Sequence, residues 1–442
     1  MLTRVGHLLF RSTTLRVFGM VVMLAGAAKV VGLVKEMAVA ARFGTGPALD
    51  AYLFIFNILS TPASMWFSTI SAVLVPQLIA WQRNAPEEAS RFRSEFLSFA
   101  IVAGVVAGLL GLIGLYGFIA SGMSGLDGAA SRHALTVLPY LWLMVPLLFV
   151  AQYGASCLMA RNLHANSLYE GAPALIILIA LLVLPASIRT LSIATVLGFG
   201  LQLAATFISL ARCGSLARPM VGFRSSVWIG LWSSLLAMAC VQFLQSAVSV
   251  VDQIIAAQLP AGSLSRFGYA LRAQGLVLTL LALAVPRVLL PALASMSHAG
   301  PEELKRFVNR WAMLLIVAGG ATAAITALLS EPVIAMLFER GSFSAADTKT
   351  VSTLLAVMIW QLPFYLLTML YAQRQIVARD FTSLIATAVG TLVVKLTVGM
   401  ALVWKFGLVG LTASIPIVAA FQVMCLVYLG RKAGRRPIPA KS

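Results

Sequence analysis

The stretch from Lys29 to Asp50 reads KVVGLVKEMAVAARFGTGPALD and places charged side chains inside an apolar run. A charge at the middle of a bilayer costs roughly 2.5–3.5 kcal/mol, so such residues usually face a bundle interior or a wet cavity. On a helix, Lys29 and Glu36 share a face, whereas Lys35 points about 120° away from Lys29. Arg42 marks the far interface. The stretch therefore predicts a membrane-spanning helix with a functional polar side.

The composition around this stretch indicates a polytopic membrane protein. The chain has 442 residues, of which 60% are hydrophobic and 10% charged, and its mean hydropathy is +0.95. The net charge of +18 is explained by Lys and Arg in cytoplasmic loops and by anionic lipid surfaces, so no nucleic acid is expected as a partner. The four scattered cysteines form no disulfide framework.

Hydropathy predicts an all-α fold with about twelve transmembrane helices. The expected spans are residues 15–42, 51–80, 95–121, 134–160, 166–186, 190–211, 227–257, 264–296, 307–330, 348–378, 382–404 and 408–430. Residues 1–16 are interpreted as an amphipathic cytoplasmic lead-in and not as a removed signal peptide. Most of the 32 Lys and Arg then fall on the inside when both termini are cytoplasmic, which predicts that topology.

An internal repeat predicts two parallel six-helix bundles. Residues 75–78 (VPQL) are followed by residues 86–92 (PEEASRF), and residues 290–293 (LPAL) are followed at the same spacing by residues 301–307 (PEELKRF). Parallel repeats are a transporter architecture with a substrate site between the halves near the midplane. We therefore expect bundles at 1–218 and 219–442 around a central cavity.

Three basic residues within the spans are the candidate substrate site. Lys29, Lys35 and Arg272 suit an anionic headgroup such as a phosphate. The structural alternative is that each extends to an interface or pairs with a nearby acid. For Arg287 and Lys395, which lie closer to the expected helix ends, extension to the interface is the favoured interpretation.

Acidic residues supply candidates for the cavity and for coupling. They are Glu36, Asp50, Asp252 and Asp380. Asp252 is interpreted either as a cation or proton site or as a structural partner for a buried base. For Asp380, an interfacial ion pair with Arg379 is favoured over an ion site. Asp50 is interpreted as the N-cap of the second span, and the alternative is that it lies at the outer mouth of a cavity.

No sequence pattern predicts an enzyme. The GxSxG, HExxH, Walker A and paired-carboxylate patterns are absent from the sequence, and the four histidines are too dispersed for a metal site. We therefore expect a protein without catalytic residues or a resident cofactor. Gly104 and Gly108 are interpreted as helix-packing residues. Polar residues beside Pro62 either line a cavity or bond to neighbouring helices.

Several motifs carry a resemblance to a known family. They lie at residues 29–36 (KVVGLVKE), 41–46 (ARFGTG), 50–52 (DAY), 252, 262–265 (GSLS), 269–272 (YALR) and 337–348 (LFERGSFSAADT). The chain resembles the MurJ/MviN-type lipid II flippases over nearly its whole length. The resemblance implies the multidrug/oligosaccharidyl-lipid/polysaccharide exporter fold and the flipping of undecaprenyl-diphosphate-linked sugars to the outer leaflet. It also implies that Lys29, Lys35 and Arg272 fall where the family carries cavity arginines that bind the diphosphate.

The chain departs from the family pattern at three points. Lys stands in place of Arg at two of the cavity positions, which keeps the charge but loses the bidentate fork. The family's paired arginines in span 2 fall on Ala63 and Ser64. The family usually has two further C-terminal spans, whereas hydropathy gives about twelve spans here. An exopolysaccharide or O-antigen repeat unit is therefore an alternative cargo to a lipid II-like one.

Together these features predict an alternating-access flippase driven by membrane potential, Na⁺ or H⁺. Its expected partners are the lipid-linked glycan, membrane lipids and enzymes of envelope glycan synthesis. A cation-coupled drug exporter is the alternative within transport, although it would favour buried acids. A glycan polymerase or ligase would need a large outer loop. A non-transporting scaffold of envelope glycan synthesis would act through the basic tail.

Overall fold

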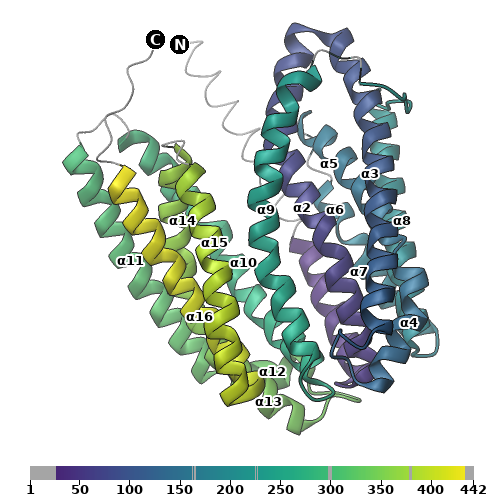
Figure 1. The fold of residues 1–442 in the computed structure, drawn as a ribbon, viewed down its shortest axis with the longest axis vertical. Helices are drawn as coiled ribbons and strands as arrows, with labels where there is room; N and C mark the ends of the chain where they lie inside the picture. The colour runs from purple at the N-terminus through teal and green to yellow at the C-terminus, as the bar shows by residue number, and fades with distance from the viewer. Residues whose placement is uncertain are drawn as a thin grey trace, which may run out of the picture. The chain divides into compact units, whose positions relative to one another are not determined.

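The computed structural model describes residues 26–161, 163, 166–223, 225, 227–296, 301–377 and 381–433. Almost all of these residues are helical, and no strand occurs among them (Figure 1). The predicted all-α class is therefore confirmed. The N-terminal lead-in and Asp380 lie outside the described residues, as does the side chain of Arg287.

The described helices include many that can cross a membrane. Seven are long and apolar enough, or eight if the bent pair Gly128–Leu141 and Met144–Met159 is one span. A shorter apolar helix, Ala172–Val183, and helices at 26–43 and Ser263–Met296 occupy further ranges where the sequence predicts spans. The chain is a multi-pass membrane protein.

Two compact units divide the described chain. The first comprises Met1–Gly44, Phe54–Ser124 and Gly128–Gln242, and the second comprises Thr45–Leu53, Gly125–Asp127 and Phe243–Ser442. The helices α2 (Pro47–Asn84) and α9 (Val227–Ala257) each contribute to both. The division after residue 218 expected from the repeat stays a prediction.

The first unit is built on close helix packing and aromatic stacking. Besides the helix at 26–43 and parts of α2 and α9, it contains α3 (Pro86–Ala120), α4 (Gly128–Leu141), α5 (Met144–Met159), α6 (Asn166–Tyr169), α7 (Ala172–Val183) and α8 (Ile188–Arg212). A Cβ at Gly104 in α3 would lie 2.9 Å from Pro146 Cα in α5, which confirms the packing role predicted for this glycine. Trp66 stacks on Phe149 with ring centroids 4.9 Å apart. These contacts fix α2, α3 and α5 against one another.

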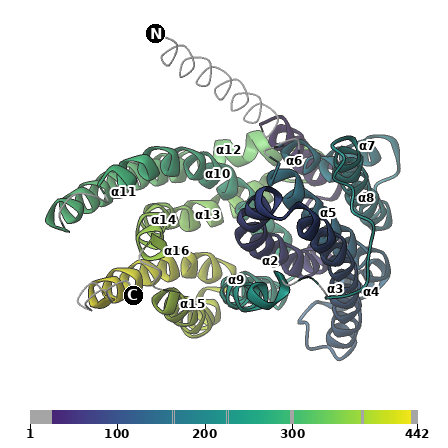
Figure 2. The ribbon, with the colours of Figure 1, turned by 90° about the horizontal axis from the view of Figure 1, so that it is seen from above.

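The second unit contains the remaining helices. They are α10 (Ser263–Met296), α11 (Pro301–Leu328), α12 (Ser330–Phe338), α13 (Ala345–Met358), η1 (Ile359–Gln361), α14 (Leu362–Val377), α15 (Phe381–Val394), the π-helix η2 (Lys395–Gly399) and α16 (Met400–Ala433). Figure 2 shows α14 beside α16, and their apolar side chains meet where Leu366 and Leu370 pack in one cluster with Val423. Gly407 has φ 56° and breaks α16 where the sequence separates the last two spans.

Candidate functional site

Lys35 and Glu36 lie on the helix at 26–43 and form an ion pair with each other. Their side chains are 19% and 16% exposed, so the pair is largely shielded from solvent. Lys29, on the same helix, is exposed. Lys35, predicted as a ligand-binding base, therefore has Glu36 as an acidic partner. Pairing with a nearby acid is the structural alternative that the sequence left open. A ligand anion at Lys35 would meet the carboxylate of Glu36 beside it.

Lys29 also acts electrostatically on an acid. The carboxylate of Glu170, in the turn between α6 and α7, experiences its positive charge and accepts a hydrogen bond from Asn166 Nδ2 at 3.0 Å. A Cβ at Gly171 would lie 3.0 Å from Ala28 Cβ, so this turn packs against the helix at 26–43 one residue before Lys29. The first unit thus places one acid near each predicted lysine.

The hydroxyls around Pro62 are bonded within their own helix. Proline lacks a backbone N–H and cannot complete the helical ladder. Thr61 Oγ1 and Ser60 Oγ donate to the Asn57 carbonyl at 2.8 and 3.0 Å, and Ser64 Oγ donates to the Ser60 carbonyl at 3.1 Å. These three hydroxyls therefore bond to their own helix, and whether the polar residues beside Pro62 line a cavity stays a prediction. Ala63 is buried and Ser64 is exposed.

Asp50 caps a helix other than the predicted one. The helix α2 begins at Pro47, so Asp50 lies inside its first turn, and the expectation of an N-cap of the second span is wrong. Its carboxylate instead accepts the backbone N–H groups of Gly262 and Ser265, each at 2.6 Å. Those donors belong to the N-terminus of α10, where unsatisfied N–H groups favour an anion. The acid therefore joins the starts of α2 and α10.

Asp347 is a second junction in the same unit. It closes a capping box with Ser344 at the start of α13. Its Oδ1 accepts Thr45 Oγ1 at 2.7 Å, and Arg266 donates to it from both Nε and Nη2 at 3.1 Å. Asp347 belongs to the motif at residues 337–348, but its partners Thr45 and Arg266 are distant in the sequence, so sequence spacing alone does not indicate this junction.

Asp252 pairs with a buried lysine. Its Oδ1 lies 2.5 Å from Lys395 Nζ, and the Lys395 side chain is 1% exposed. The expectation that Lys395 extends to the interface is therefore wrong, because its ammonium ends on a carboxylate inside the unit. For Asp252, the structure shows the second of the two predicted arrangements, a partner for a buried base. Its role in coupling stays a prediction.

Arg272 is half-buried on α10 and lies against its own helix. Its guanidinium carbon is 5.7 Å from the centroid of the Tyr269 ring, a cation–π distance. A Cβ at Gly268 would lie 2.9 Å from Arg272 Nη1, so this glycine leaves room for the guanidinium. Arg272 belongs to the second unit and the two lysines to the first. That the three bind one diphosphate stays a prediction.

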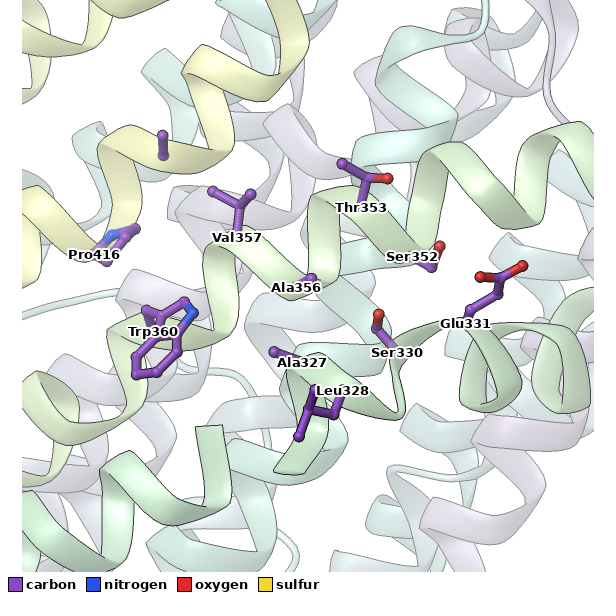
Figure 3. Close-up of a pocket in the computed structure, with 11 residues that line it drawn as sticks. Ala327, Leu328, Ser330, Glu331, Ser352, Thr353, Ala356, Val357, Trp360 and Pro416 are labelled. Atoms are coloured by element: carbon purple, nitrogen blue, oxygen red, sulfur yellow. The ribbon is translucent and has the colours of Figure 1, made fainter. Parts of the chain in front are cut away.

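A cavity of about 770 Å³ lies within the second unit, apart from all of these residues. Figure 3 shows its polar residues Ser330, Glu331 and Ser352 toward one end, and Trp360 and Pro416 toward the other. The hydroxyl of Ser352 donates to the Lys349 carbonyl at 3.0 Å, which leaves its oxygen as an acceptor. None of the predicted site residues lines this cavity.

Comparison with known proteins finds a matching family. The model of the family described as lipid II flippase MurJ matches residues 39–441. The curated protein "Probable lipid II flippase MurJ" of Rhizobium meliloti (strain 1021) is 26% identical over 352 residues, which cover 76% of this chain and 65% of that relative. The match thus spans slightly less than two thirds of the relative's length.

Two solved structures share the fold. "Lipid II flippase MurJ, inward closed conformation" superposes with a TM-score of 0.79 at 18% identity, covering 93% of this chain and 87% of that chain. An inward-facing multidrug resistance MATE family transporter of the MOP superfamily superposes with a TM-score of 0.75 at 13% identity, covering 92% and 94%. The exporter fold expected from the resemblance is confirmed. Because the family model extends over most of its residues, this chain belongs to the lipid II flippase MurJ family.

Proposed function

We propose that this chain translocates an undecaprenyl-diphosphate-linked saccharide across the bacterial cytoplasmic membrane by alternating access. The observation that carries the proposal is the family match over residues 39–441. The name of the curated relative supports lipid II as the cargo class. A lipid II-like precursor and an exopolysaccharide repeat unit share the prenyl diphosphate. No covalent bond of the cargo changes, so the protein acts as a transporter and not as an enzyme.

The basic residues are assigned to the diphosphate. Lys29, Lys35 and Arg272 would together neutralise its negative charge, and Arg272 alone offers the planar fork that matches two phosphate oxygens. The exposure of Lys29 supports access of a ligand to that side chain. The saccharide would lie in the central cavity that the repeat predicts, while the prenyl chain stays in lipid.

Alternating access is the movement that the predicted pair of parallel repeats would perform. Repeats of this kind expose a midplane site to either side by rocking of one bundle against the other. Both termini are placed in the cytoplasm by the positive-inside rule. The cargo would enter from the inner leaflet and leave to the outer leaflet, where enzymes of envelope glycan synthesis consume it.

A reconstituted assay tests this proposal. Proteoliposomes that contain the purified protein and a defined lipid-linked saccharide should show protein-dependent flipping. The variants Lys29→Ala, Lys35→Ala and Arg272→Ala should each lower the rate at least about tenfold, whereas Lys405→Ala, which removes an exposed lysine, should not. A triple variant of the site that flips at the wild-type rate would refute the assignment. Transport of cationic drugs without flipping would indicate the drug-exporter alternative.

A further inference from the structure

The pair of Asp252 and Lys395 is the most deeply enclosed charge pair that the described part of the second unit contains. Lys395 Nζ lies 2.5 Å from Asp252 Oδ1 and donates to Ser414 Oγ at 2.6 Å. Ser414 Oγ in turn donates to the Leu411 carbonyl at 2.6 Å. The ammonium is therefore held by a carboxylate of α9 and a hydroxyl of α16.

The local backbone is shaped around the lysine stem. Lys395 opens the π-helix Lys395–Gly399, a rare conformation that occurs often at functional sites. A Cβ at Gly399 would lie 3.6 Å from Lys395 Cδ and 3.8 Å from Cε, so the stem runs over this glycine. The route directs the ammonium inward and not toward an interface.

The neighbouring hydroxyls on α15 are already engaged. Thr387 Oγ1 donates to the Ser383 carbonyl and Thr391 Oγ1 to the Thr387 carbonyl, each at 2.7 Å. Both residues are buried. These bonds stay within the helix and leave each hydroxyl oxygen able to accept. Among the described residues, the contacts of the Lys395 ammonium are those with Asp252 and Ser414.

This set of groups is what a small cation would require. Hard cations take oxygen ligands from carboxylates, hydroxyls and carbonyls, and a carboxylate within a membrane needs a compensating positive charge. We propose that the Lys395 ammonium fills, from within the chain, the position where Asp252 would otherwise hold an alkali cation from solution. Asp252 then takes no part in ion coupling while Lys395 is present, and removal of the ammonium opens a cation site.

The consequence for transport rests on the proposed function, but the binding claim does not. If the chain flips a lipid-linked saccharide, Asp252 cannot link that movement to a sodium gradient. Flipping would then draw on membrane potential or on another group. Ion binding is measured on purified protein without cargo, so a failure of the flipping assay leaves the binding result interpretable.

The test compares melting temperatures in detergent in NaCl, LiCl, KCl and choline chloride at one ionic strength. Wild type and the control Lys405→Ala should melt at the same temperature in all four salts. Lys395→Ala should show a saturable rise of at least about 3 °C in one alkali salt over choline. The double variant Lys395→Ala/Asp252→Asn should lose that rise. Binding of radioactive sodium to the same four proteins provides a second measurement.

Two outcomes overturn the proposal. One is a saturable alkali-cation effect on wild type that Asp252→Asn abolishes, a test that needs no substitution at Lys395. The other is a folded Lys395→Ala protein, monodisperse in detergent, that neither binds sodium nor gains stability from any alkali salt. Should Lys395→Ala aggregate, Lys395→Gln, which keeps most of the side-chain volume, replaces it with the same expected result.

Discussion

The carboxylate of Asp50, in the first turn of α2, accepts the backbone N–H of Ser265 at 2.6 Å, although the two residues are 215 positions apart. The same carboxylate accepts the Gly262 N–H. Asp50 thus provides the cap that α10 lacks locally, because Gly262 has no side chain and has φ 85°. The position of α10, which carries Arg272, depends on this bond between distant segments.

Replacement of Asp50 by Ala should destabilise the protein. Two buried N–H groups at the start of α10 would lose their acceptor, at an expected cost of about 1–3 kcal/mol. Asp50→Asn should cost less, since the amide oxygen still accepts. Thermal unfolding in detergent measures both, with Glu331→Gln as the control for loss of an exposed negative charge. An Asp50→Ala protein as stable as that control would show that the cap contributes nothing.

Glu95 should be the acid on which the connection between α8 and α9 depends. Its fully buried side chain accepts the Trp228 indole N–H at 2.8 Å and the Ser225 backbone N–H at 3.2 Å. Glu95→Leu should cost about 1–3 kcal/mol for each donor left without an acceptor. It should also increase protease cleavage within residues 213–223.

The matched control for Glu95 is its ion-pair partner Arg91, which lies one turn earlier on α3. The Arg91 side chain is 46% exposed, so Arg91→Ala should cost less than about 1 kcal/mol. Equal losses for Glu95→Leu and Arg91→Ala in urea unfolding would argue that the ion pair, and not the buried hydrogen bonds, holds this segment.

The helices were predictable because each span is a long apolar run, and such runs are visible in the sequence alone. The sequence separated the last two spans beside Gly407, where the backbone indeed breaks. The ion-pair partners of charged side chains were harder to predict from the sequence. Lys395 is close to a helix end in the sequence, which favoured an interfacial position, but its partner Asp252 comes from another helix and reverses that expectation.

The acids show the same limit of sequence reasoning. Asp50 was recognised as a cap from its residue type and the preceding turn, yet the capped helix was misassigned, because sequence spacing reports only local neighbours. Asp347 carried a local signal, the capping box with Ser344, whereas Arg266 and Thr45 join it only in the fold. Residue types thus indicated which carboxylates form capping hydrogen bonds, and the tertiary structure determined which segments those bonds connect.

Two glycines of α3 should respond oppositely to alanine. At Gly104 a Cβ would lie 2.8 Å from Phe149 Cβ and 2.9 Å from Pro146 Cα, so Gly104→Ala must push α3 from α5 and should cost about 1–3 kcal/mol. At Gly114 no atom lies within 4 Å of the new Cβ, and alanine should stabilise the helix by up to about 1 kcal/mol. Melting temperatures of both variants test this. A Gly104→Ala protein that melts no lower than wild type would exclude tight packing here.

The last prediction concerns the competition between Glu36 and a bound anion. Glu36 pairs with Lys35, so a diphosphate at this lysine must displace or tolerate that carboxylate. Glu36→Gln should therefore tighten binding of inorganic pyrophosphate to the purified protein about three- to tenfold, as expected for loss of an ion pair worth about 1 kcal/mol. Glu87→Gln removes the same charge at an exposed position of α3 and should leave the affinity unchanged. The gain should vanish in Glu36→Gln/Lys35→Ala, because the freed ammonium is its source. If Glu36→Gln and Glu87→Gln bind pyrophosphate equally well, or if the gain persists without Lys35, this lysine is not a diphosphate ligand and the anion binds elsewhere.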